Sequence, residues 1–239
     1  MISVKQLLYK TDLRQNKLAT NDHQEIPVED KLFSINEQQL KLIKKKISTN
    51  NIYQIGLDGF KKRYEDLQNL IIQSEEALVK KGKDSFDYFL LDTTTLKNKY
   101  LFFISLTAIC TKGKCTERPL AITKIVKHAD LQTTMKNSND VPSFESQETI
   151  AIISGDKIYI YTDGTFDINK VYITYLKYPQ KVDLEGYIDL EGNPSITQDC
   201  ELHEFLEDEL LDLVQLDLAL NTENIPSAQG AEIKSKTNE

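Results

Sequence analysis

Three cysteines and one histidine have the chemistry to bind a metal ion. Cys110 and Cys115 flank a short polar segment, and Cys200 and His203 lie three residues apart. Thiolate sulfur and imidazole nitrogen are the ligands that structural zinc sites prefer. However, the spacing is not that of a zinc knuckle, and nothing in the sequence brings the two pairs together. We therefore expect reduced structural cysteines, with no metal and no cofactor.

A second candidate for chemistry is a run of acidic residues near the C-terminus. Glu204, Asp208 and Asp212 recur every four residues, which places them on one face of a helix. A catalytic carboxylate pair needs a pocket that shifts its pKa, whereas this face has the character of a solvated one. His23 and His128 lie in no motif with a nucleophile. Phosphate-loop, nucleophile-elbow and dinucleotide motifs are also absent, so we expect no enzymatic activity.

The composition narrows the class of protein. With 40% apolar and 28% charged residues, a chain of 239 residues is typical of a folded globular protein rather than a disordered one. Three cysteines are too few for a disulfide framework and indicate a reducing compartment. The N-terminus has no apolar stretch typical of a secretory signal, and the longest apolar run, Tyr100–Cys110, is too short to span a bilayer.

The formal net charge of -8 is distributed unevenly along the chain. No Lys or Arg occurs between Val182 and Ile233, a stretch that contains 14 Asp and Glu, whereas basic clusters such as 44–46 and 61–63 lie earlier. The acidic excess argues against a protein that coats nucleic acid. The two regions can attract each other within a subunit or between subunits, or both can be solvated helix faces. Attraction between subunits would make an assembly loosen as salt is raised.

Apolar residues at helical spacing occur near both ends of the chain. Ser34 and Glu37 have the spacing of a capping box, and the polar residues before them, 16–30, are expected to form a loop. The expected helices cover residues 2–14, 34–47 and 58–81, and a last one from a cap at Thr197 or Asp199 to Asn221.

The middle of the chain is rich in β-branched and aromatic residues, which favour strands. We expect a buried strand over 100–110, a turn at Lys112–Gly113, a returning strand over 119–126, and further strands over 149–153, 157–162 and 170–178. The last strand has apolar residues on both faces, which is typical of a strand between two layers or at an interface. One face holds Val171, Ile173 and Tyr175, and the other holds Tyr172, Leu176 and Tyr178.

These elements predict an α+β protein: a helical bundle with an inserted antiparallel, sandwich-like β-module and an extended C-terminal tail. The predicted helical body comprises residues 1–86 and 182–225. The β-module is predicted over 87–181 and a flexible tail over 226–239.

Two segments carry a resemblance to a known family. Val171–Leu184, in which Tyr178-Pro179 and Lys181 follow a strand, resembles the end of the β-module in adaptor proteins of short-tailed phages. Cys200–Val214 resembles the helix that follows in that family, although the family often has Pro or another small residue where this chain has Cys200. The resemblance is closest to ring and tail-tubular head-to-tail connector proteins, including those of crAss-like phages. The two motifs cover about a sixth of the chain, and the helix–β–helix order extends over most of it.

The resemblance implies a structural virion protein at the head–tail junction, assembled in the host cytoplasm. It implies a ring, usually of twelve copies, that binds the portal protein above and the next tail ring or nozzle protein below. DNA passes through its channel without specific binding, and no membrane is involved. The subunit and partner interface is expected to include Leu202, Phe205, Leu206, Leu210, Leu213, Tyr175, Tyr178, Pro179, Lys181 and Ile225.

Two other functions are compatible with the residues. A β-sandwich over 87–181 could bind glycan or peptide from a helical stalk, with Tyr159, Tyr161, Tyr172, Tyr175 and Tyr178 as an aromatic platform. The absence of Trp argues against a sugar binder. An enzyme that uses Cys200 or the acidic helix is the third alternative.

Overall fold

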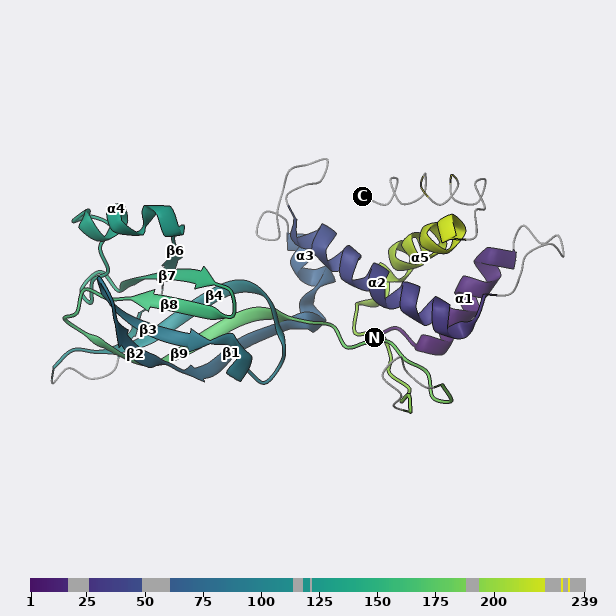
Figure 1. Cartoon of the computed structure of the whole chain (residues 1–239), viewed down its shortest axis with the longest axis horizontal. Helices are drawn as coiled ribbons and strands as arrows, with labels where there is room; N and C mark the ends of the chain where they lie inside the picture. The colour runs from purple at the N-terminus through teal and green to yellow at the C-terminus, as the bar shows by residue number, and fades with distance from the viewer. Residues whose placement is uncertain are drawn as a thin grey trace. The chain divides into compact units, whose positions relative to one another are not determined.

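The computed structural model describes residues 1–16, 26–48, 61–113, 118–120, 122–187, 194–221, 229 and 232. The chain is an α+β protein, as predicted, and it divides into two compact units (Figure 1). The helical unit combines Met1–Leu70 with Pro179–Glu239, and the β unit is Ile71–Tyr178. The helical unit is therefore built from both ends of the chain, and the β unit is inserted between them.

Among its described residues, the helical unit has three main helices, α1 (Val4–Asn16), α2 (Val28–Ile47) and α5 (Glu207–Asn221), and a short α3 (Lys61–Asp66). Each main helix buries residues three or four positions apart, which is the pattern of a helix with one face in a core. The side chains of these helices that are fully withdrawn from solvent include Leu7, Ile35, Leu42, Ile43, Leu210 and Val214.

Helix α2 begins six residues before the predicted start. It follows Pro27, and Glu29 and Asp30 lie in its first turn, where negative charge is favourable beside the helix dipole. Ser34 is therefore in the helix interior and buried, so the predicted capping box is wrong. The acidic first turn stabilises this helix start through its charge, and no side-chain hydrogen bond caps it.

The start of the last helix was also predicted wrongly. A 3-10 turn, Glu204–Leu206, leads into α5, and the His203 imidazole accepts a hydrogen bond from the Phe205 N–H. Asp199 instead accepts from the Val4 N–H at 2.9 Å, so it caps the first turn of α1. Ile2 and Cys200 exchange two backbone hydrogen bonds of 3.0 Å beside it. The segment before α5 thus binds the N-terminus of the chain.

Two sheets form the β unit. One has the order β1-β9-β4-β5 and the other β2-β3-β8-β7-β6. Their inner faces share one core, in which Val171 and Ile173 of β9 lie with Ile158 and Ile160 of β8. The strands are β1 (Ile71–Leu78), β2 (Lys80–Lys83), β3 (Asp87–Asp92), β4 (Tyr100–Thr111), β5 (Arg118–Leu120), β6 (Ile122–Ile125), β7 (Glu148–Ser154), β8 (Lys157–Tyr161) and β9 (Asp167–Lys177).

The predicted strands over 100–110, 149–153, 157–162 and 170–178 are confirmed as β4, β7, β8 and β9. The helix predicted over 58–81 is wrong after Leu70, because 71–78 form β1 on the edge of the first sheet. A short apolar pattern does not distinguish a helix from a strand. Here residues 71–78 form a strand because they pair with β9. The β unit accordingly begins at Ile71 rather than at residue 87.

The returning strand predicted over 119–126 is split between the sheets. Arg118–Leu120 pairs with β4 as an antiparallel hairpin arm, whereas Ile122–Ile125 pairs with β7 in the other sheet. The β6–β7 pair is parallel, so the prediction of a wholly antiparallel module is wrong. Parallel neighbours need a crossover connection, and the segment that contains α4 (Leu131–Lys136) supplies it.

Gly82 of edge strand β2 lies against the ring of Tyr88 on β3. A Cβ at position 82 would approach the Tyr88 ring atoms to 2.5 Å. The ring also packs against Tyr159 and Tyr161, with centroid distances of 5.3 and 6.1 Å. Any side chain at 82 therefore competes with this aromatic cluster.

We predict a coupling between these two positions. Gly82→Ala should cost about 1–2 kcal/mol more in the wild-type protein than in a Tyr88→Ala background, because only the first forces the ring away from its neighbours. Urea denaturation of the four proteins of this double-mutant cycle measures the coupling. Equal costs in the two backgrounds would show that the contact has no effect.

Candidate functional site

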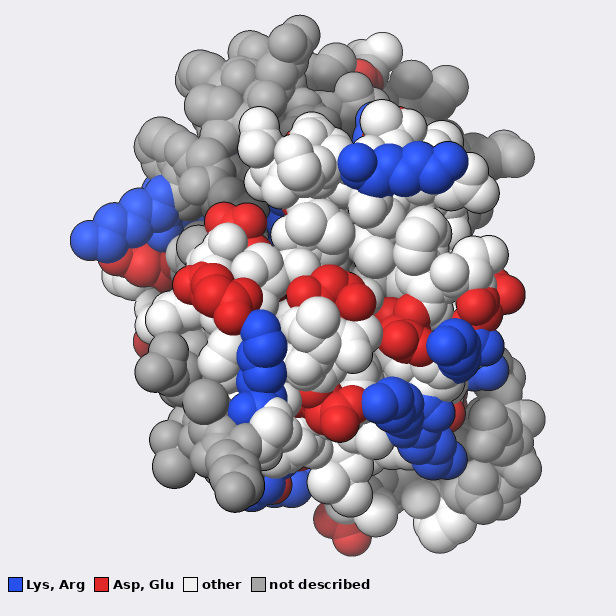
Figure 2. All heavy atoms as spheres, turned by 90° about the vertical axis from the view of Figure 1, so that its left-hand side faces the viewer, with Lys and Arg blue, Asp and Glu red and all other residues white. Residues whose placement is uncertain are grey.

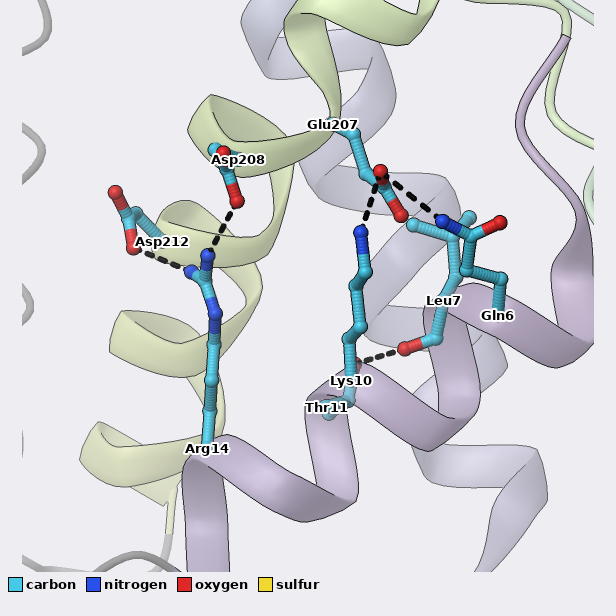
Figure 3. Close-up of polar contacts among 8 residues, drawn as sticks. All are labelled: Gln6, Leu7, Lys10, Thr11, Arg14, Glu207, Asp208 and Asp212. Atoms are coloured by element: carbon cyan, nitrogen blue, oxygen red, sulfur yellow. Dashed lines mark hydrogen bonds and ion pairs between the residues drawn. The ribbon is translucent and has the colours of Figure 1, made fainter.

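Basic side chains of α1 bind acidic side chains of α5. The Lys10 ammonium lies 2.7 Å from Glu207. The Arg14 guanidinium bridges two carboxylates, Asp208 at 2.8 Å and Asp212 at 2.5 Å (Figure 3). The two cations are four residues apart and therefore lie on one face of α1. This arrangement joins residues almost 200 positions apart in the sequence.

A second set of contacts joins α2 to α5. The Lys46 ammonium lies 2.8 Å from Glu209 and 3.5 Å from Asp66 of α3. Further along, the Ser34 hydroxyl donates a 2.6 Å hydrogen bond to Asp217. Together with the pairs on α1, these contacts form what we call the ionic seam: Lys10, Arg14, Ser34, Lys46, Asp66, Glu207, Asp208, Glu209, Asp212 and Asp217.

The ionic seam is partly withdrawn from water. The side chains of Asp212 and Glu209 are 5% and 8% exposed, whereas that of Asp208 is 80% exposed. A charge removed from water is costly unless a counter-charge accompanies it. Removing one partner of a buried pair is therefore costly, whereas the exposed Asp208 contributes little.

The seam corrects the expectation of a solvated acidic face. Glu204 and Asp208 are exposed as predicted, but Asp212 is buried against Arg14. The acidic and basic residues of the seam pair with each other within one chain. The sequence did contain a signal, because Lys10 and Arg14 repeat at the same four-residue step as Asp208 and Asp212, but it did not show which helices face each other.

The described cysteines and His203 are not grouped as a metal site would require. Cys110 lies in the β unit and Cys200 in the helical unit, both buried and reduced, while Cys115 and His23 fall outside the described residues. The His203 ring stacks on Phe205 at 4.8 Å. Among the residues that the structure describes, no three His, Cys, Asp or Glu side chains are grouped to hold a metal ion.

Burial also suppresses thiol chemistry. It raises the pKa of the Cys110 thiol from 9.0 to about 12 and that of Cys200 to about 11. The reactive form of cysteine is the thiolate, so both thiols are held in the unreactive form near neutral pH. This arrangement is the opposite of the electropositive, accessible setting that a nucleophilic cysteine needs.

The predicted interface residues differ widely in how exposed they are. Several already pack inside the chain and are not available to a neighbouring subunit, so their assignment to an interface is corrected: Leu202, Leu206, Leu210 and Tyr175, each at most 2% exposed. Leu213 and Pro179 are half-buried, and Tyr178 is half-buried beneath the Lys99 ammonium at 4.5 Å. Phe205, at 85% exposed, and Lys181 lie on the surface. Ile225 lies outside the described residues.

The five tyrosines proposed as an aromatic platform do not share a surface. Tyr159 and Tyr161 lie on the outer face of the five-stranded sheet, and Tyr172 lies on the other sheet. Tyr175 is fully buried and donates a hydrogen bond to Glu75 at 2.7 Å. The platform on which the glycan-binding alternative depended is therefore not formed.

Comparison with known proteins gives no relative: no protein-family model matches the chain, and no curated protein matches it. Within the described residues, no helix has the length and apolar character needed to cross a bilayer.

We predict that the ionic seam can be tested on one helix. Lys46→Met should destabilise the protein by about 2–3 kcal/mol, because it leaves Glu209 and Asp66 buried without this cation. Lys41→Met is the matched control: Lys41 also lies on α2 but forms a 3.5 Å pair with Glu37 in which both side chains are about half exposed. Its effect should stay within about 0.5 kcal/mol. Equal unfolding free energies for the two variants in chemical denaturation would contradict a structural role for the seam.

We also predict that the buried thiols are protected. In a Cys115→Ser background, a thiol-reactive dye should label Cys110 and Cys200 only after the protein is unfolded. Labelling kinetics in buffer and in denaturant measure this difference, with a cysteine-containing peptide as the reference. Labelling of Cys200 in the folded protein at the peptide's rate would return the thiol enzyme to consideration.

Proposed function

We propose that this chain is the subunit of a homo-oligomeric connector ring at the head–tail junction of a short-tailed phage, with a structural role and no catalysis. The observation that carries the proposal is the inserted architecture. A helical unit from both chain ends holds a β unit between Leu70 and Pro179, in the helix–β–helix order that the resemblance implies.

The same proposal gives each part of the chain a role in the ring. Helices α1, α2 and α5 are the bundle that forms the body of the ring, and the β unit is the sandwich-like module that meets the next tail ring or nozzle protein. The C-terminal segment, 226–239, is the extension that reaches a neighbouring subunit. Of this segment the structure describes only Gln229 and Glu232, both in helical conformation and exposed.

The ion pairs of the seam lie within one chain, so they can form in each subunit before it assembles. Because its buried charges are paired within the chain, the contacts between subunits are expected to depend on other surfaces. The expectation that salt loosens the ring through these charges therefore loses its basis. Phe205 is the predicted interface residue that best fits a contact with a neighbour, since it is 85% exposed.

The charge distribution is compatible with a channel through which DNA passes. A net charge of -8 disfavours tight binding to phosphates. On the face shown in Figure 2, the described Lys and Arg side chains are interspersed with Asp and Glu rather than gathered into a basic patch. Such a surface has no strong electrostatic hold on a passing duplex.

The proposal is tested by the mass and shape of the assembled protein. Native mass spectrometry and negative-stain imaging, at high protein concentration and with portal protein present, should show rings of about twelve copies of the 27.4 kDa chain. Addition of DNA should leave the ring without a sequence-specific complex. Monomers alone under these conditions would overturn the proposal.

A further inference from the structure

The four-stranded sheet of the β unit has a second face that points away from the shared core. Along β9, Val171 and Ile173 point into the core, so Lys170 and Tyr172 point outward. The strand register places Leu78 and Ile109 on either side of Lys170, and Glu76 and Thr107 on either side of Tyr172. We call these six residues the outer sheet face: Glu76, Leu78, Thr107, Ile109, Lys170 and Tyr172.

The outer sheet face is both accessible and partly apolar. Leu78 is 77% exposed, and Ile109 and Tyr172 are half-buried. A solvated outer face of an antiparallel sheet is ordinarily polar. Two cross-strand rows that present a leucine, an isoleucine and a tyrosine instead have the composition of a protein contact surface.

The charges of this face cancel. Within β1, β9 and the part of β4 that pairs with them here, its charged residues are Lys170 and Glu76, which form a 3.2 Å ion pair. Copies of a chain with a net charge of -8 repel one another over most of their surface. They approach at the lowest electrostatic cost where the local charge is close to zero, as it is at this ion pair.

Two edge strands of the β unit are poorly suited to edge-to-edge association. Edge strand β1 is interrupted between Ile72 and Glu75, where Ser74 has a φ of 49°. Edge strand β2 carries Lys80, Lys81 and Lys83 in four residues. Bulges and lysines are the means by which proteins prevent edge-to-edge pairing, so neither of these two edges favours contact with a second copy.

We propose that a second copy of this chain packs against the outer sheet face, making it one of the two surfaces through which neighbouring copies touch. This inference rests on the proposed ring. It assigns the contact to Leu78, Ile109 and Tyr172, with Lys170 and Glu76 as a pair whose charges offset each other. None of these except Tyr172 belongs to a segment that carries the phage-connector resemblance.

The experiment compares variants of the full chain by analytical ultracentrifugation and negative-stain imaging. Leu78→Asp should raise the concentration needed for assembly by at least about tenfold, because it places an unpaired charge in the contact. Ile125→Asp is the matched control, since Ile125 is an exposed apolar residue of the same unit on the other sheet, 47% exposed. It should assemble as the wild type does. Thermal melts of both variants establish that they fold.

A charge exchange tests the electrostatic part of the argument. Glu76→Lys makes the face doubly positive and should weaken assembly, whereas the double variant Glu76→Lys with Lys170→Glu restores neutrality and should restore assembly to within about threefold. Both side chains are more than 40% exposed, so the exchange does not disturb the core.

The outcomes separate the inference from the function on which it rests. Rings that form equally well in the wild type, Leu78→Asp and Glu76→Lys overturn the assignment of this face and leave the ring intact. Equal loss of assembly in Leu78→Asp and Ile125→Asp also overturns it, because the effect is then not specific to the face. A wild type that stays monomeric overturns the ring and the inference together.

Discussion

The pairing of buried carboxylates on α5 with cations on α1 and α2 is the constraint on which the helical unit depends. Asp212 and Glu209 are almost fully withdrawn from water, and the nearby cations Arg14 and Lys46 lower the cost of burying their charges. The partners come from opposite ends of the chain. These ion pairs therefore also join the two segments of the chain between which the β unit is inserted.

The backbone at the chain ends follows the same logic. Asp199 caps α1, and Ile2 and Cys200 exchange backbone hydrogen bonds. In addition, the amide of Asn36 donates to the Val182 carbonyl and its oxygen accepts from the Val182 N–H. Polar groups that would otherwise lie unpaired at helix ends and chain crossings are thus satisfied by residues far away in the sequence. This long-range pairing lets a discontinuous unit fold as one body.

The ion pairs of the seam lie within a subunit, which alters what the uneven charge of the chain implies for assembly. Acidic and basic regions separated in sequence suggest subunits that attract one another, yet the cations of the seam pair with carboxylates of the same subunit. In the proposed ring, contacts between copies are then left to surfaces with little net charge and some apolar area. The outer sheet face has both properties, and it belongs to the inserted unit.

The sequence by itself determined the α+β class, the strands β4, β7, β8 and β9, and the two faces of β9, because strong periodic patterns report which side of an element is buried. It also determined the charge asymmetry and the lack of a recognisable catalytic motif. It did not determine β1, whose apolar spacing fits a helix as well as a strand, or the parallel β6–β7 pair, which depends on the crossover through α4. Nor did it show that Leu202, Leu206 and Leu210 pack inside the chain or that Asp199 caps α1. Those outcomes were decided only by the tertiary structure, because each depends on which partner, often more than a hundred residues away, supplies the hydrogen bond, the counter-charge or the apolar surface.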